Sequence, residues 1–454
     1  MVADPTASVS GLPVPGTGAS APAAGLASVT REFVRLRPQT FGLLYSPTAP
    51  GAEASVGLVV MHPNADFLEH VAGVELARRG FRVLCINGQY FNTNRETMIW
   101  EQVPLDVKPA VEYLRNLAGI RTVALVGHSG GGQLMPFYQN VAENGPEASR
   151  GADRIAQGGD DLADLPPADA LVLLDAHHGY SANTLTSMDP SVRDESRPSD
   201  VDPTLDVFNP ANGYDPAGSM YGDDFKQRYF RAQAERMQRL NEAALARNAA
   251  IAAGQGQFPD DEPFPLARSQ ARLWQLDTRL VSHTKGAYPV IKPDGSIVVD
   301  VARSVRVSGV TPKSGGAPSL TARQNASWAQ GAVAYTVRSW LSSNALWVDP
   351  DRYTITEDDI RGIDWHSSNT STPANLEGVR VPLLIMAMTG HYWLVPGEIF
   401  FQHAASPDKQ LVFVEGASHN IVPCRACEQY PGQYGDTVQT TFDYVAAWLR
   451  ERFL

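Results

Sequence analysis

Short apolar runs alternate with longer amphipathic stretches through the first part of the chain. The amphipathic stretches, residues 67–80 and 104–118, have the apolar spacing of helices that cover a hydrophobic surface. The apolar runs are almost free of polar residues, as in strands buried on both faces, and they span residues 57–61, 81–86, 122–126 and 168–174. This order of elements predicts an α/β fold with a mostly parallel sheet covered by helices.

The alternation stops near residue 180 and resumes only at residue 381. Residues 381–386 and 410–414 are again predicted to be buried strands, and residues 440–453 a closing amphipathic helix. The chain is longer than one compact core usually needs, so the interruption indicates a large insertion. We therefore expect a flexible tail (1–30), a core (31–180 and 376–454) and an inserted cap (181–375).

The insertion has predicted structure of its own. Residues 223–253 carry apolar side chains at helical spacing, and residues 322–341 are predicted to form a second helix. Residues 288–301 are predicted to form a β-hairpin, because Asp294-Gly295 is a strong two-residue turn signal. The chain shows no internal repeat, so we expect the insertion to be a cap rather than a second copy of the core.

The composition is that of an ordinary globular protein. Apolar residues make up 43% of the 454 residues and charged residues 19%. The net charge of −12, without any Lys/Arg run, argues against a nucleic-acid partner, which needs excess positive charge on some face. No apolar stretch approaches the ~20 residues of a membrane span, so none is expected.

The N-terminus and the cysteines bear on the location of the protein. The first residues are rich in Pro, Gly, Ala and Ser and lack the basic and apolar regions of a signal peptide. The 3 cysteines are too few for a disulfide scaffold. We therefore expect a cytoplasmic protein, and the sequence leaves open whether it forms a homodimer.

A glycine-rich turn directly follows the predicted strand at 122–126. Residues 127–131 read GHSGG, which is the G-x-S-x-G pattern placed between a strand and a helix. In such a turn the flanking positions must be glycine, because a side chain there would collide with neighbouring backbone. The serine hydroxyl is lifted above the sheet, so the context predicts that Ser129 is a nucleophile.

A serine hydroxyl needs a base to activate it, and that base must be oriented by a third group. His419 lies in a glycine-containing loop just after the predicted strand at 410–414, far downstream of Ser129. None of the other histidines has so favourable a position. We therefore expect His419 to be the base that takes the proton of Ser129.

Three motifs together resemble the α/β-hydrolase superfamily: the turn GHSGG, the strand and loop VEGASH that end at His419, and the strand LLIMAMTG before them. The resemblance covers roughly residues 31–180 and 376–454 and implies the α/β-hydrolase fold. Within the superfamily the chain is more similar to the esterases than to the dehalogenases or epoxide hydrolases, which carry aspartate where this chain has Ser129. The resemblance implies no cofactor.

The acid of the triad departs from the commonest family pattern. The family usually has Asp or Glu about three residues beyond the strand that precedes the histidine strand. That loop here contains His391 and aromatic residues, and its first carboxylate is Glu398. Some members take the acid from the end of the preceding core strand, where this chain has Asp175. Both remain candidates, and position favours Asp175.

An oxyanion hole needs two backbone N–H donors. The first is expected to be the N–H of Gly130, the residue after the nucleophile. The second normally comes from the loop after the first central strand, which here begins His62-Pro63. Because proline has no N–H, Asn64 is expected to supply it, with Ala65 as the alternative in a longer loop. His62 resembles a histidine that is usually structural in the family.

Two further patterns suggest metal or redox chemistry but are better explained by structure. Cys424 and Cys427 have C-x-x-C spacing without a second such pair, which predicts reduced thiols or a small disulfide that fixes the loop after His419. His177 and His178 follow Asp175, but adjacent side chains diverge and cannot readily share one ion. No metal site is therefore predicted.

The sequence thus predicts a serine hydrolase that cleaves a carboxylic ester of a small organic substrate through an acyl-enzyme. An amide, a lactone or a carbon–carbon bond is the nearer alternative substrate for the same triad. A non-catalytic binding protein on the same scaffold is the more distant alternative, and the missing acid at the usual position is the feature that favours it.

Overall fold

The computed structural model of the chain describes residues 27–454 except 39, 92–94, 270 and 309–331. A 10-stranded sheet runs through it in the order β1-β2-β4-β3-β5-β6-β13-β14-β8-β9. The strands from β4 to β8 in this order are parallel, whereas β1, β2 and β9 at the two edges pair antiparallel with their neighbours. The predicted α/β fold with a mostly parallel sheet is confirmed.

The strands of this sheet occupy the predicted apolar runs and four further segments. The central strands are β3 (Val56–Met61), β4 (Arg82–Asn87), β5 (Thr122–Ser129), β6 (Ala170–Ala176), β13 (Leu383–Met388) and β14 (Lys409–Val414). The edge strands are β1 (Val29–Arg37), β2 (Thr40–Pro47), β8 (His283–Ile291) and β9 (Ile297–Arg303). Strand β1 thus begins inside the predicted tail, whose residues 1–26 lie outside the described residues.

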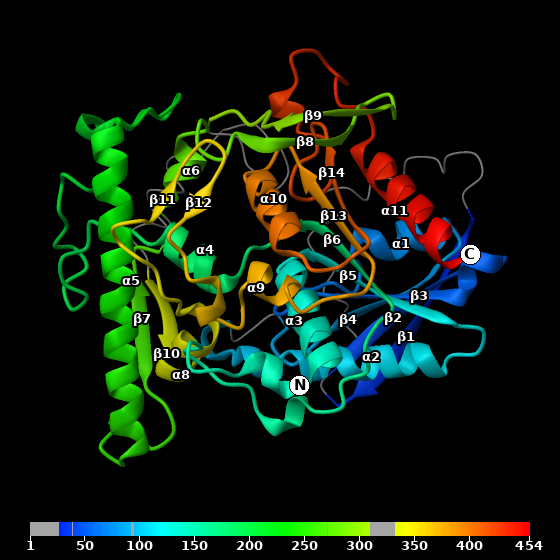
Figure 1. Cartoon of the computed structure of the whole chain (residues 1–454), viewed down its shortest axis with the longest axis horizontal. Helices are drawn as coiled ribbons and strands as arrows, with labels where there is room; N and C mark the ends of the chain where they lie inside the picture. The colour runs from blue at the N-terminus through cyan, green and yellow to red at the C-terminus, as the bar shows by residue number, and fades with distance from the viewer. Residues whose placement is uncertain (1–26, 39, 92–94, 270, 309–331) are drawn as a thin grey trace, which may run out of the picture.

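Helices cover both faces of the sheet, as Figure 1 shows. On one face α1 (Val71–Arg78) and α11 (Thr437–Phe453) contribute Leu76 and Phe442 to one buried apolar cluster. On the other face α2 (Pro104–Asn116), α3 (Gly131–Asn144) and α10 (Leu394–His403) contribute to a second, larger cluster. Among the helices that the structure describes, none combines the length and apolar character needed to cross a bilayer.

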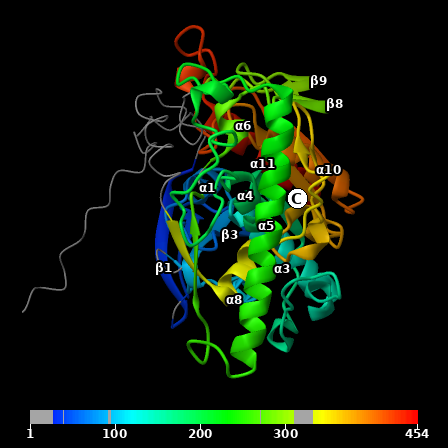
Figure 2. The same cartoon turned by 90° about the vertical axis from the view of Figure 1, so that its left-hand side faces the viewer.

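The inserted segment divides into two parts. The predicted hairpin at 288–301 is present as β8 and β9, but it pairs with β14 and so extends the central sheet instead of standing in the cap. The rest is built around α5 (Asp223–Ala252), which lies along the left side of the molecule in Figure 1 and across the face turned toward the viewer in Figure 2. Its other described elements are α4 (Tyr180–Ser187), β7 (Pro263–Ala267), α6 (Leu273–Leu276), β10 (Ala332–Thr336), α8 (Val337–Ser339), β11 (Thr354–Ile355), β12 (Ile360–Arg361) and α9 (Thr372–Leu376).

The predicted helix at 322–341 is only partly correct: residues 337–341 are helical, in α8 and the short π-helix Trp340–Asn344 that follows it, but the described residues before them are not. Residues 322–331 lie outside the described residues, and Ala332–Thr336 form strand β10, which pairs antiparallel with β7. The alanine-rich sequence favours a helix locally, but the partner strand lies far away in the chain, and tertiary pairing overrides the local preference.

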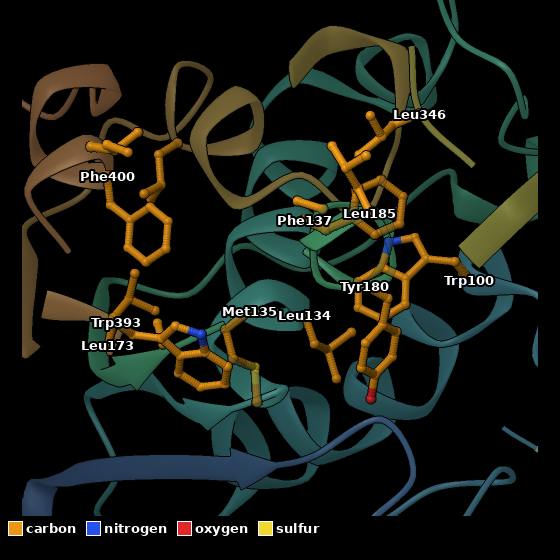
Figure 3. Packing of buried hydrophobic residues seen from close by; sticks show 14 of the residues in the cluster. Trp100, Leu134, Met135, Phe137, Leu173, Tyr180, Leu185, Leu346, Trp393 and Phe400 are labelled. Carbon is orange, nitrogen blue, oxygen red and sulfur yellow. The ribbon is translucent and has the colours of Figure 1, made fainter. Parts of the chain in front are cut away.

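The insertion and the sheet share one hydrophobic core. Leu185 and Leu346 of the insertion belong to the same buried cluster as Phe137 of α3. Figure 3 shows these three side chains gathered with Trp100. Burial of each large apolar side chain is worth roughly 1.5–3 kcal/mol, so this contact fixes the insertion firmly on the sheet.

Candidate active site

Four neighbouring strands bring the site together at their carboxyl ends. In the sheet order β5, β6, β13 and β14 are adjacent, and Ser129 and Asp175 lie at the ends of the first two. His391 and His419 lie in the loops that follow the other two. Parallel strands end at the same edge of a sheet, so residues far apart in the sequence meet there.

The turn around Ser129 has the strained geometry that the glycine pattern predicts. Ser129 has a φ of 57°, a left-handed conformation that non-glycine residues rarely adopt. A Cβ on Gly127 would lie 2.5 Å from the carbonyl oxygen of Gly131, and one on Gly131 would lie 2.3 Å from that of Met61. Both positions therefore require glycine. Helix α3 then begins two residues after Ser129, with its N-terminus beside the hydroxyl.

Ser129 and His419 are hydrogen-bonded to each other. The Ser129 hydroxyl lies 2.9 Å from His419 Nε2, and the His419 side chain is almost wholly buried. His419 Nδ1 lies 2.6 Å from Asp175 Oδ2. An ionised carboxylate can only accept, so the proton of the neutral imidazole is on Nδ1 and Nε2 accepts from the serine. This is the tautomer that a general base needs.

Asp175 is fully buried and has a φ of 41°, next to an irregularity in the pairing of β5 with β6. Its Oδ1 accepts a hydrogen bond from the Met388 N–H at 3.3 Å. Burial alone would raise the pKa of this carboxyl, but the charges and N–H donors of His391 and then His419 outweigh burial and hold the pKa below its ordinary value. Asp175 is therefore ionised at neutral pH.

Glu398 lies elsewhere, although it is also buried. Its carboxylate accepts hydrogen bonds from the Lys285 and Gly286 N–H groups, each at 2.8 Å, and from the Tyr288 hydroxyl at 3.0 Å. These three partners belong to strand β8, so Glu398 fastens α10 to the added hairpin. Of the two candidate acids, the structure brings only Asp175 to His419.

A second histidine, His391, contacts the same carboxylate oxygen. Its Nδ1 lies 2.6 Å from Asp175 Oδ2, and its ring stacks on that of His419 with centroids 4.5 Å apart. Asp175, His391 and His419 together have the composition of a metal-ligand set. A zinc ion lies about 2.0 Å from each ligand atom, however, and two such bonds do not fit within a 2.6 Å separation. The spacing is therefore too short for two ligands of one zinc ion.

Two further histidines, His70 and His128, are linked in series to the backbone carbonyl of His419. His128 Nε2 lies 2.7 Å from the His419 carbonyl oxygen, and His128 Nδ1 lies 2.9 Å from His70 Nε2. His70 Nδ1 in turn accepts from the Ala72 N–H at the start of α1. Every donor in this chain meets one acceptor when both imidazoles are neutral, and burial accordingly lowers the pKa of His70.

The candidate oxyanion donors lie on the two loops predicted for them. Gly130 follows Ser129, and a Cβ on it would lie 2.5 Å from His62 Nε2, so the His62 ring packs against this glycine. His62 Nδ1 accepts hydrogen bonds from the Asn64 N–H at 3.2 Å and the Ala65 N–H at 2.9 Å. His62 therefore shapes this loop. The Asn64 side chain is fixed by the Tyr180 hydroxyl, 2.9 Å from its Oδ1.

Aromatic side chains surround the two imidazoles. The Trp393 ring stands edge-on to His391 at 4.7 Å and to His419 at 4.8 Å. Trp274 of the insertion packs against His178 at 5.6 Å and against Tyr392 at 5.5 Å. Because His178 follows β6 and Tyr392 follows β13, Trp274 brings part of the insertion to the carboxyl ends of these strands.

The C-x-x-C pair forms a disulfide. Cys424 and Cys427 are joined, and the Cys424 N–H donates to the Gly416 carbonyl, which ties the loop around His419 to the end of β14. Of the two structural alternatives predicted for this pair, reduced thiols or a small disulfide, the structure has the disulfide. Disulfides are rare in the cytoplasm, so this bond does not favour the predicted location. Cys85 is buried and free.

The sequence assigned no role to His391, His128 or His70. His391 occupies the loop where the family usually carries its acid, and a histidine at that position was the sequence signal that could have marked it as a site residue. His128 lies inside the GHSGG turn itself. Their partners come from other strands and from α1, so no local pattern marks them.

Comparison with known proteins gives a distant likeness. No family model matches the chain, and no curated protein matches it in sequence. Similar solved structures include a soluble variant of monoglyceride lipase from Saccharomyces cerevisiae (10% identity, 97% of this chain and 99% of that chain, TM-score 0.41). Others are brefeldin A esterase, a bacterial homologue of human hormone sensitive lipase (11%, 98% and 80%, 0.38), and proline iminopeptidase from Mycobacterium smegmatis (12%, 93% and 99%, 0.38).

The architecture of the chain itself carries the assignment of its fold. The sheet is parallel through its centre, with the antiparallel β1–β2 pair at one edge. Ser129 lies in a tight turn between β5 and α3, and His419 lies in the loop after β14. These features match the motifs that suggested the family, and the chain has the fold of the α/β-hydrolase superfamily.

Proposed function

We propose that the protein is a serine hydrolase that cleaves a carboxylic ester through an acyl-enzyme intermediate. One observation carries the proposal: an unbroken path of hydrogen bonds runs from Asp175 through His419 to Ser129. The path ends at a hydroxyl held in the strained turn beside the start of α3. A serine without such a base is a poor nucleophile, so this arrangement supports catalysis.

In the proposed reaction His419 Nε2 takes the Ser129 proton while Oγ attacks the carbonyl carbon of the ester. Asp175 stabilises the imidazolium that forms, and His419 then gives its proton to the leaving alcohol. A water molecule, activated by the same imidazole, attacks the acyl-enzyme and releases the acid. The chain's own side chains perform each of these proton transfers, so the proposal requires no cofactor.

The oxyanion of the tetrahedral intermediate is proposed to bind the N–H groups of Gly130 and Asn64. The Asn64 N–H shares His62 Nδ1 with the Ala65 N–H, and Ala65 makes the shorter bond. Ala65 can therefore hold the loop to His62 while the Asn64 N–H turns toward the oxyanion. The bond between Tyr180 and the Asn64 side chain limits how far this residue can move.

We propose a small organic ester as the substrate, because this type of nucleophile turn acts most commonly on esters. The insertion would act as a cap, since Trp274 already lies at the strand ends beside Tyr392. The alternative of a non-catalytic binding protein loses its main support, because it depended on a missing acid and Asp175 is hydrogen-bonded to His419.

A fluorophosphonate probe tests the proposal directly. It reacts with an activated serine, and we expect a covalent adduct on the peptide that contains Ser129, identified by mass spectrometry. Ser129→Ala is the matched control and should carry no adduct. A folded wild-type protein that fails to react would contradict the proposal. A panel of p-nitrophenyl esters of different acyl length, with lactones and amides beside them, then distinguishes the ester from the alternative bonds.

A further inference from the structure

His391 holds a position in the site that the proposed mechanism does not use. It follows β13 by three residues, where the family usually carries the triad acid, and its side chain is almost wholly buried. The Asp175 carboxylate oxygen 2.6 Å away favours a proton on this Nδ1, because an unprotonated nitrogen at that distance would repel the anion. The carboxylate is thus approached by two imidazole N–H donors instead of one.

The two donors compete for a single oxygen atom. His391 Nδ1 and His419 Nδ1 each lie 2.6 Å from Asp175 Oδ2, whereas Oδ1 accepts from the Met388 backbone at 3.3 Å. A donor on an anion withdraws electron density, which weakens the other bond that the same oxygen accepts. It also fixes the carboxylate, because three donors from different segments now hold it.

We propose that His391 is a positioning residue that holds Asp175 in its orientation toward His419 and moderates how strongly Asp175 stabilises protonated His419. The inference rests on the proposed function, since it concerns the efficiency of the same triad. Two contacts fix the His391 ring for this role: it stacks on His419 at 4.5 Å, and Trp393 stands edge-on to both imidazoles.

Other titratable groups surround the three residues and bear on any pH dependence. His178 is fully buried, and burial lowers its pKa to about 3, so it is neutral at the pH of an assay. Burial raises the pKa of the Tyr392 hydroxyl, because it disfavours the charged form of that group. Further neighbours are His62, His70 and His128 on the side of β5 and α1, His177 after β6, and Arg272 and Arg306 on the side of the insertion. Replacing His391 alone removes none of these groups.

The test compares two variants of His391 with a matched control. His391→Leu removes the donor, whereas His391→Asn keeps an N–H that can reach the carboxylate. His403→Asn is the control, because His403 Nδ1 also contacts a carboxylate, Glu377 at 2.7 Å, but at the far end of α10. The measurement is kcat and KM on a p-nitrophenyl ester as a function of pH.

For His391→Leu we expect the acid limb of the kcat/KM profile to move to higher pH by about one unit. Without the competing donor, Asp175 stabilises protonated His419 more strongly, so a higher pH is needed to free the base. We also expect kcat to fall roughly 10- to 100-fold with KM nearly unchanged, because Asp175 is less well held. His391→Asn should recover most of both effects. An unshifted acid limb in His391→Leu, or an equal shift in His403→Asn, would overturn the inference.

A second measurement does not depend on turnover or on the folding of a variant. In wild-type protein with ¹⁵N-labelled histidine we expect two far-downfield Nδ1–H resonances, one each from His391 and His419. The His419 resonance should move on labelling with the fluorophosphonate, while the His391 resonance persists. A single such resonance would refute the role of His391, whereas failure of the probe to react would refute the proposed function alone.

Discussion

Replacing Asp175 by asparagine should stop catalysis while the fold survives. The three donors around the carboxylate leave no acceptable orientation for an amide. If the amide NH₂ takes the place of Oδ2, it faces the N–H groups of His391 and His419. If it takes the place of Oδ1, it faces the Met388 N–H. Either arrangement leaves a buried donor unsatisfied, which costs about 1–3 kcal/mol of stability.

The loss of rate should be far larger than the loss of stability. The Met388 N–H is always a donor, whereas the imidazole of His419 can change tautomer, so the amide oxygen of the asparagine faces Met388 and the amide NH₂ faces His419 Nδ1. The imidazole then carries its proton on Nε2, where it cannot accept from Ser129. The same change in a known triad lowers kcat by about 10⁴-fold. That factor corresponds to about 5.4 kcal/mol of transition-state stabilisation. We expect kcat/KM of Asp175→Asn to fall by this order.

Glu398→Gln should show the opposite result. Its oxygens accept from Lys285, Gly286 and Tyr288, so the amide must lose at least one of these bonds. We expect the free energy of unfolding to fall by about 1–3 kcal/mol. Because none of these partners touches His419, kcat/KM should stay within about 3-fold of the wild-type value.

Both variants can be measured with one ester substrate and one denaturant titration. Circular dichroism must first show that each protein is folded under the conditions of the assay. Asp175→Asn that keeps a tenth of the wild-type kcat/KM would refute the assignment of the acid. Glu398→Gln with the larger loss of rate, and with unchanged stability, would move the assignment to Glu398.

Three further outcomes are expected. Gly131→Ala should destabilise the protein by roughly 1–3 kcal/mol in a denaturant titration, because its Cβ would lie 2.3 Å from the Met61 carbonyl oxygen. Thiol titration of the unfolded, unreduced protein should find Cys85 alone, and reduction should raise the number to 3 per chain. The lowered pKa of Asp175 means that its ionised form contributes stability that is complete above the ordinary value of ~3.9 and is lost as the pH falls through the lowered pKa. The stability difference between wild type and Asp175→Asn should therefore be constant near neutral pH and shrink below about pH 4.

Local patterns in the sequence predicted the centre of the fold and missed its edges. The strands at 57–61 and 122–126 are nearly continuous apolar runs, because helices cover both faces of the sheet there. The edge hairpin at 288–301 was recognised from its turn, but its place beside β14 could not be predicted. Pairing partners distant in the chain leave no local signal, which also explains why Ala332–Thr336 is a strand and not a helix.

The same division holds for the site: its locally determined residues were predictable, and the contacts between distant strands were not. Ser129 lies in a motif whose steric demands are local, since the collisions that require its glycines involve the turn itself and the adjoining strand. His419 follows a strand that is recognisable from its sequence. The choice between Asp175 and Glu398 depends on which carboxylate faces His419 across neighbouring strands, and that depends on the conformation of a single residue at the end of β6.

The position of the acid and the presence of His391 are two consequences of one geometric fact. The ends of β6 and β13 are adjacent, so a side chain from either strand end can reach the imidazole of His419 in the loop after β14. When the carboxylate comes from β6, the usual acid position after β13 still lies beside His419. The side chain at that position therefore has to be compatible with a buried carboxylate next to it. A carboxylate there would repel Asp175, and an apolar side chain would leave one lone pair unsatisfied. An imidazole with a proton on Nδ1 satisfies it, and His391 lies at that position.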